Sequence, residues 1–170
     1  MTDIIGMHWA EDADGIVTLT MDDPTSEANI MNEVFEKSLT ETVAKLQAEK
    51  ARIKGIILTS AKKTFFAGGD LTALIQVQPE HAAFFEQKVS ELKARLRALE
   101  TLGKPVVAAM NGTALGGGLE IALSCHHRIA LNNPKAEFGL PEVSLGLLPG
   151  AGGVIRTVRM LGIQNALMNV

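Results

Sequence analysis

Strand-like apolar runs alternate with long amphipathic stretches along most of this chain of 170 residues. The patterns follow one another as strand 15–21, helix 32–50, strand 53–60, helix 71–77, helix 80–102, strand 106–110, helix 117–125 and short strands 128–131 and 137–139. Because alternating strands and helices form βαβ units, they predict an α/β protein with a largely parallel sheet. No repeat or linker interrupts the pattern, so residues 1–170 are predicted to form one domain.

Composition and charge exclude several classes of protein. The chain is 46% hydrophobic with a net charge of −3, which does not provide the basic surface of a nucleic-acid binder. No apolar run approaches the roughly 20 residues of a membrane span. The segment Met1–Gly6 lacks the features of a signal peptide, and a single cysteine, Cys125, cannot form an internal disulfide. These features predict a cytoplasmic protein.

Two glutamates stand beside glycine-rich turns. Glu120 ends the segment NGTALGGGLE, and Glu142 lies in FGLPE, shortly before the turn PGAGG. Two carboxyl groups can divide acid and base roles when their surroundings separate their pKa values. Considered singly, each glutamate fits a structural role better: Glu120 would favour a helix N-terminus, and Glu142 could be a solvated loop acid or could cap a helical turn. Apolar neighbours predict that Glu120 is desolvated and that the 143–148 loop is packed.

The glycine turns are predicted to expose backbone N–H groups. The turn at 111–120 runs from a strand into a helix, where free amides point outward and can stabilise an enolate oxygen or bind phosphate. A tight turn in which two backbone segments pass closely explains the glycines of this segment equally well. A second turn, AGGD at 67–70, follows a buried strand and would be capped by Asp70. Its position, after a strand end, is typical of ligand sites in α/β sheets.

Other motifs carry less chemistry. His126 and His127 adjoin Cys125, but no second cluster stands at ligand spacing, so no metal site is expected. No Gly-x-Ser-x-Gly elbow is present, which disfavours a serine hydrolase. The apolar stripe formed by Phe84, Phe85, Val89, Leu92 and Leu96 is interpreted as a core face.

Taken together, three segments resemble the crotonase, or enoyl-CoA hydratase/isomerase, superfamily. They are FFAGGDL (65–71), KPVVAAMNGTALGGGLEIALSCHHRIA (104–130) and FGLPEVSLGLLPGAGG (138–153). The third motif and the Glu120–Glu142 spacing look most like those of the N-terminal hydratase modules of multifunctional fatty-acid oxidation polypeptides. The resemblance implies the ClpP/crotonase spiral of ββα units. It also implies that the C-terminal helical part is missing and that the helix beginning near Gly153 is unfinished.

The resemblance also implies site residues and partners. Gly69 and Gly117 would supply the two N–H groups of an oxyanion hole, and Glu120 and Glu142 would be the catalytic glutamates. The residues implied for acyl-CoA binding are Ala67, Gly68, Asp70 and Leu71. Hydration would need no cofactor, and NAD would enter only with a downstream dehydrogenase module. The implied partners are a second copy of the chain, in a trimer-type oligomer, or a thiolase subunit.

The expected reaction is reversible hydration of trans-2-enoyl-CoA to 3-hydroxyacyl-CoA in β-oxidation. Glu120 would act as base toward water, and Glu142 would deliver a proton to C2. Two alternatives remain open. One is a 3,2-enoyl-CoA isomerase of the same family, in which one glutamate moves the proton. The other is a non-catalytic module that binds acyl-CoA or serves assembly.

Overall fold

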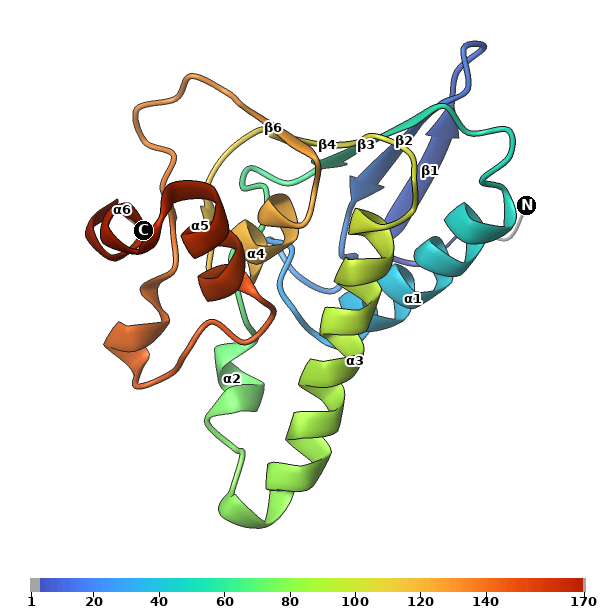
Figure 1. Cartoon of the computed structure of the whole chain (residues 1–170). Helices are drawn as coiled ribbons and strands as arrows, with labels where there is room; N and C mark the ends of the chain where they lie inside the picture. The colour runs from blue at the N-terminus through green and yellow to red at the C-terminus, as the bar shows by residue number, and fades with distance from the viewer. Residues whose placement is uncertain (1–3, 170) are drawn as a thin grey trace.

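A five-stranded, mostly parallel sheet forms the centre of the protein, in a computed structural model that describes residues 4–169 (Figure 1). Both ends of the predicted 1–170 domain therefore lie outside the described residues. The strand order is β1-β2-β3-β4-β6, with β1 antiparallel and the other neighbours parallel. The strands are β1 (Met7–Glu11), β2 (Ile16–Met21), β3 (Gly55–Ser60), β4 (Val106–Met110) and β6 (His127–Ala130). The predicted α/β class with a parallel sheet is confirmed.

Two long helices cover one face of this sheet and pack on each other (Figure 1). They are α1 (Glu33–Ala48) and α3 (Ala82–Glu100). As predicted, the Asn32 side chain caps α1 by accepting a hydrogen bond from the Phe35 amide at 3.0 Å. The core between helices and sheet consists of fully buried apolar side chains, including Val17, Leu46, Leu96 and Ala108. Burial of this kind is the main stabilising term of the fold.

Shorter elements make up most of the rest of the described chain. They are α2 (Leu71–Leu74), η1 (Pro79–His81), β5 (Ala114–Leu115), α4 (Gly117–Leu123), β7 (Phe138–Gly139), η2 (Pro141–Leu145), α5 (Gly153–Leu161) and α6 (Ile163–Asn169). β5 pairs in parallel with β7, and it also forms a bridge to Phe66 through Ala114. The short strand β5 therefore holds three segments together that are far apart in sequence.

Several local predictions are wrong. β1 was not expected from the sequence; it is an edge strand in which only Met7 is buried. The helix predicted over 71–77 ends at Leu74, and the one predicted over 80–102 begins as a 3₁₀ turn. The helix that begins at Gly153 stops at Leu161, because Gly162 adopts a positive φ of 76° and a second helix follows.

One packing prediction fails and a second is confirmed only in part. The 143–148 loop is not packed: its apolar side chains are exposed, Val143 by 80% and Leu148 by 82%. In the apolar stripe of α3, Leu92 and Leu96 belong to the core, but Phe84 is 62% exposed because it lies where α3 projects beyond the sheet (Figure 1).

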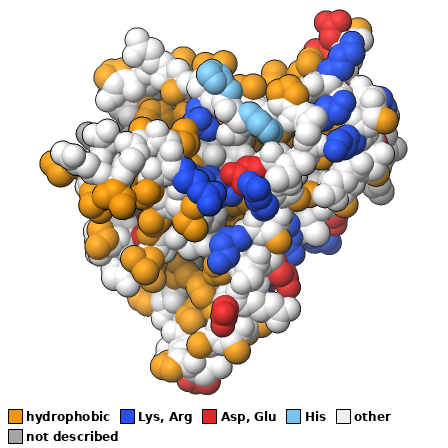
Figure 2. Space-filling model, in the orientation of Figure 1, with side chains coloured by type: hydrophobic (Ala, Val, Ile, Leu, Met, Phe, Trp, Pro, Cys, Tyr) orange, Lys and Arg blue, Asp and Glu red, His pale blue; other side chains and the backbone are white. Residues whose placement is uncertain are grey.

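An exposed apolar surface covers the C-terminal part of the chain. Figure 2 shows hydrophobic side chains gathered on the side of the molecule that carries α5 and α6. We call this the C-terminal apolar surface; its members are Val143, Leu145, Leu147, Leu148, Val154, Ile155, Met160, Leu161, Ile163, Leu167 and Met168. An apolar surface of this extent is uncommon on a monomer and is typical of an interaction site.

Candidate active site

Two glycine loops lie against each other at the carboxyl ends of β3 and β4. Leu115 N–H donates to Phe66 O at 3.2 Å, and the Cα of Gly68 lies 3.9 Å from the position that a Cβ on Gly116 would occupy. A Cβ on Gly118 would overlap the Phe66 carbonyl, so this close approach requires glycine. The sequence prediction that both loops belong to one site agrees with this contact.

The N–H groups of Gly69 and Gly117 are unpaired in the part of the chain that the structure describes. No hydrogen bond within residues 4–169 uses either N–H group as donor. Gly117 is the first residue of α4, where the helix itself provides no acceptor and the dipole is positive. Unpaired amides in such positions are the donors that an oxyanion requires.

Glu142 reaches the glycine turn through the pairing of β5 with β7. Gly116 N–H donates to Gly139 O at 2.9 Å, which brings the first turn of η2 beside the loop. Glu142 Oε1 then lies 2.9 Å from the position of a Cβ on Gly116, and Oε2 is buried with no hydrogen-bond partner among the described residues. Burial raises the pKa of Glu142. This favours a carboxyl group that keeps its proton.

Glu120 lies deeper, in the first turn of α4. Its side chain is 3% exposed, and Oε1 accepts a hydrogen bond of 2.7 Å from the Gly153 amide, at the first residue of α5. Burial raises the pKa of Glu120; the Gly153 hydrogen bond opposes this, and the charge of Glu142 adds to the rise. The prediction that Glu120 is desolvated is confirmed. The same contact also fits the structural alternative, since a carboxylate stabilises a helix N-terminus.

The two carboxyl groups therefore differ in hydrogen bonding, although both have raised pKa values. The Gly153 amide stabilises the ionised form of Glu120, whereas one oxygen of Glu142 has no such donor. Since a like charge raises the pKa of Glu120, the pair retains a proton more readily than either group would alone. One carboxylate and one carboxylic acid can act as a base and an acid toward the same substrate.

The residues predicted to bind acyl-CoA lie on the 67–71 loop beside Gly69. Ala67 and Leu71 are exposed, Leu71 by 54%, and Gly68 is buried with a positive φ of 107°. Asp70 caps α2 by accepting a hydrogen bond from the Ala73 amide at 3.1 Å, as predicted. Their binding role stays a prediction, and the structure gives Asp70 a structural role as well.

Sequence reasoning missed Gly153 and the segment 29–31. Gly153 donates its amide N–H to Glu120, and the available signal was its place as the last glycine of PGAGG, where a helix begins. Asn29 and Met31 contact the 67–69 loop through their backbones. The signal there was an asparagine between apolar residues, just before a helix cap.

The described part of the chain contains no group of three His, Cys, Asp or Glu side chains that could hold a metal ion. His126, which adjoins Cys125, accepts a hydrogen bond from the Val106 amide through Nδ1 at 3.1 Å. None of the helices within residues 4–169 has the length and hydrophobicity that a membrane-spanning helix requires.

Comparisons with known proteins bear on the family and the fold. The sequence profile described as enoyl-CoA hydratase/isomerase matches residues 11–169. Among solved structures, an enoyl-CoA hydratase from Bacillus anthracis is 31% identical with a TM-score of 0.83, covering 96% of this chain and 61% of that one. One from Thermoplasma volcanium is 30% identical with a TM-score of 0.79, covering 96% and 62%.

Among curated relatives, the fatty acid oxidation complex subunit alpha of Shewanella halifaxensis is 44% identical over 155 residues, which is 91% of this chain. That of Aliivibrio fischeri is 37% identical over 161 residues, or 94% of this chain. The chain spans 22% and 23% of the lengths of these two relatives. The fold and the sequence match lead to one assignment. This chain belongs to the enoyl-CoA hydratase/isomerase family and has the crotonase fold.

Proposed function

We propose that this chain is a hydratase module that adds water reversibly to trans-2-enoyl-CoA and gives 3-hydroxyacyl-CoA. The observation that carries the proposal is the unequal pair of carboxyl groups, Glu120 and Glu142, beside the free amides of Gly69 and Gly117. The carboxyl groups supply a base and an acid, and the amides supply the donors for an enolate oxygen.

In the proposed reaction, Glu120 takes a proton from water as the hydroxyl oxygen bonds to C3. The electrons of the double bond move toward the thioester oxygen, which accepts hydrogen bonds from Gly69 and Gly117. Glu142 then delivers its proton to C2 on the same face, and a proton passes from Glu120 to Glu142 to restore the pair. The hydrogen bond from Gly153 supports Glu120 as the base, because it favours the ionised form.

The names of the relatives support a place in fatty-acid oxidation. By the same reasoning we propose that the module belongs to a multifunctional polypeptide with a 3-hydroxyacyl-CoA dehydrogenase module, which would use NAD, and with a thiolase subunit as partner. The hydration step itself needs no cofactor, because the amides polarise the thioester. We propose a cytoplasmic location, which the free, buried Cys125 supports.

Replacement of Glu142 by Gln tests the proposal. The amide keeps the shape but loses the transferable proton, so hydration of crotonyl-CoA should fall by about 10²–10⁴-fold while acyl-CoA binding persists. Glu137→Gln is the matched control, since Glu137 is exposed and its side chain forms no hydrogen bond or ion pair within residues 4–169. Turnover close to wild type in Glu142→Gln would show that Glu142 has a structural role only and would contradict the proposal.

The alternatives give different results in the same assay. An isomerase would convert a 3-enoyl-CoA to the 2-enoyl-CoA and would depend on one glutamate only. A module that binds acyl-CoA without turnover would leave both substrates unchanged. No observation on the structure favours either of these over hydration.

A further inference from the structure

The 67–70 loop, which carries the Gly69 amide, lies outside regular secondary structure apart from isolated bridges and the start of α2. Two backbone hydrogen bonds tie it to the segment 29–31. Ala67 N–H donates to Asn29 O at 2.8 Å, and Met31 N–H donates to Gly68 O at 2.9 Å. The position of the Gly69 amide therefore depends on how the segment 29–31 is itself held.

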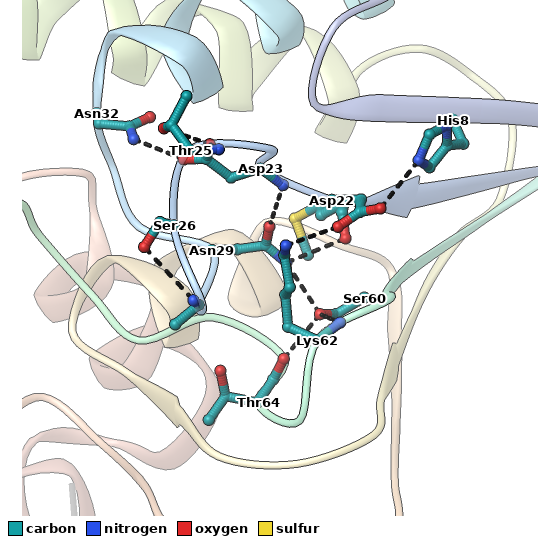
Figure 3. Close-up of polar contacts among 12 residues, drawn as sticks. His8, Asp22, Asp23, Thr25, Ser26, Asn29, Asn32, Ser60, Lys62 and Thr64 are labelled. Carbon is teal, nitrogen blue, oxygen red and sulfur yellow. Dashed lines mark hydrogen bonds and ion pairs between the residues drawn. The ribbon is translucent and has the colours of Figure 1, made fainter.

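The Asn29 side chain holds this segment to the ends of two core strands. It is 2% exposed, and its amide nitrogen donates to Met21 O at 3.1 Å and to Ser60 Oγ at 2.9 Å (Figure 3). Met21 ends β2 and Ser60 ends β3. The amide oxygen accepts a hydrogen bond from Asp23 N–H at 3.0 Å. All three contacts are buried, where hydrogen bonds are strong and unpaired groups are costly.

Ser60 extends the same network to the loop on the other side. Its hydroxyl donates to Thr64 O at 2.7 Å and accepts from the Lys62 amide at 3.0 Å, which shapes the turn that leads into Phe65 (Figure 3). Ser60 therefore fixes the turn that precedes the 67–70 loop, and Asn29 fixes the segment that lies beside the loop.

The segment 29–31 also contacts the second glycine loop. The methyl carbon of Met31 lies 2.7 Å from the position that a Cβ on Gly117 would occupy. Met31 thus contacts Gly68 through its backbone and Gly117 through its side chain. A shift of this segment would move the 67–70 loop through its backbone hydrogen bonds, and with it the Gly69 amide of the candidate oxyanion hole.

We propose that Asn29 is a positioning residue: it fixes the 29–31 segment and so sets the place of the Gly69 amide. The proposal rests on the proposed function for the role of this amide, but the anchoring of the loop can be measured without it. Only a carboxamide provides both the donors for Met21 and Ser60 and the acceptor for Asp23. An aspartate of the same shape would place a carboxylate oxygen against the Met21 carbonyl.

The test compares Asn29→Ala and Asn29→Asp with Leu46→Ala in the full 170-residue chain. Leu46 is fully buried in the last turn of α1, at the end of that helix away from the segment 29–31, so its loss destabilises the core at a distance from this anchor. Ser60→Ala removes one of the two acceptors of the Asn29 amide, together with the hydrogen bonds to Thr64 and Lys62, and replaces Asn29→Ala if that variant does not fold. All variants are measured at the same interval below their own melting temperatures.

Amide hydrogen exchange tests the anchoring. In the Asn29 variants the Ala67 amide should exchange at least about tenfold faster than in wild type, while Leu46→Ala leaves it within about twofold. Unchanged exchange at Ala67, or an equal rise in Leu46→Ala, would overturn the inference.

Infrared spectroscopy of a bound acyl-CoA with a ¹³C-labelled thioester carbonyl tests the consequence for the site. Hydrogen bonds from the two amides lower the carbonyl stretching frequency, and the Asn29 variants should lose much of this shift. In crotonyl-CoA hydration they should lose about 10-fold or more in kcat with KM nearly unchanged. If the Asn29 variants show the same carbonyl frequency shift as wild type, the inference about Asn29 is overturned and the proposed oxyanion hole is not. No shift in wild type would instead overturn the proposed oxyanion hole, and hydrogen exchange would still decide whether Asn29 anchors the loop.

Discussion

Replacement of Gly116 by Ala should displace the carboxyl group of Glu142, the proposed acid, while leaving that residue itself unchanged. Gly116 has φ 51° and ψ −122°, a backbone conformation that L-residues rarely adopt. Its new methyl group would lie 2.9 Å from Glu142 Oε1, whereas ordinary van der Waals contact begins near 3.4 Å. The carboxyl group must therefore withdraw by about half an ångström.

The expected cost has two parts. Backbone strain of about 1–3 kcal/mol should lower the free energy of unfolding. For a chain of this size, each kcal/mol lowers Tm by about 2–4 °C. A misplacement of 1 Å can cost about 10²-fold in rate, so half of that predicts a loss of about 10–10²-fold in kcat. Crotonyl-CoA hydration and thermal unfolding measure the two parts separately.

Gly146→Ala is the matched control. Gly146 also has a positive φ, of 70°, and ends η2, but a Cβ there would meet no atom within 4 Å. This variant should lose about 1–2 kcal/mol to strain and keep its kcat. Equal losses of kcat in both variants would refute the reasoning, because strain alone would then explain the result.

Three further predictions concern other parts of the site and surface. Gly117→Ala should lower kcat with a modest fall in Tm, because its Cβ would crowd only the flexible Met31 side chain; a large fall in Tm with kcat intact would favour a tight-turn role. The pKa of Glu120 in the folded state is raised above its ordinary 4.5, so with rising pH the carboxyl group ionises in the unfolded chain before it ionises in the folded chain. The free energy of unfolding therefore falls as pH rises from about 4.5 through the folded-state pKa. Glu120→Gln should therefore melt higher than wild type at pH 7 and equally at pH 4, and the reverse order would contradict the burial argument. The C-terminal apolar surface should drive association that sedimentation velocity detects and that Leu148→Lys weakens; a monomer at all concentrations would contradict it.

Much of the fold follows from local patterns. The runs that form β2, β3 and β4 are apolar enough to mark buried strands, and the side chains that cap α1 and α2 act within three residues of their own position. β1 could not be recognised, because an edge strand with one buried residue has no strong alternation. The 143–148 loop misled the prediction, since apolar composition indicates that a surface is covered but does not identify what covers it.

The site was predictable only in part. Glycine turns after strands meet at one edge of a parallel sheet, so their neighbourhood could be inferred from the order of the elements. The hydrogen bonds that fix them could not. The bond from Gly153 to Glu120 joins residues 33 positions apart, and that from Asn29 to Ser60 spans 31. Such pairs depend on tertiary packing that no local pattern describes.

The same limit applies to the assignment of acid and base. Both glutamates stand next to glycine turns and apolar residues, so residue type and sequence neighbours do not distinguish the acid from the base. In the folded chain one of them faces the first amide of α5 and the other has a buried oxygen without a donor. That difference separates their environments, and it arises because α5 begins at Gly153, where the absent side chain leaves room for the Glu120 carboxylate: a Cβ there would lie 2.9 Å from Glu120 Cγ. The glycine at the start of α5 thus bears on the chemistry of Glu120 as directly as Gly116 bears on that of Glu142.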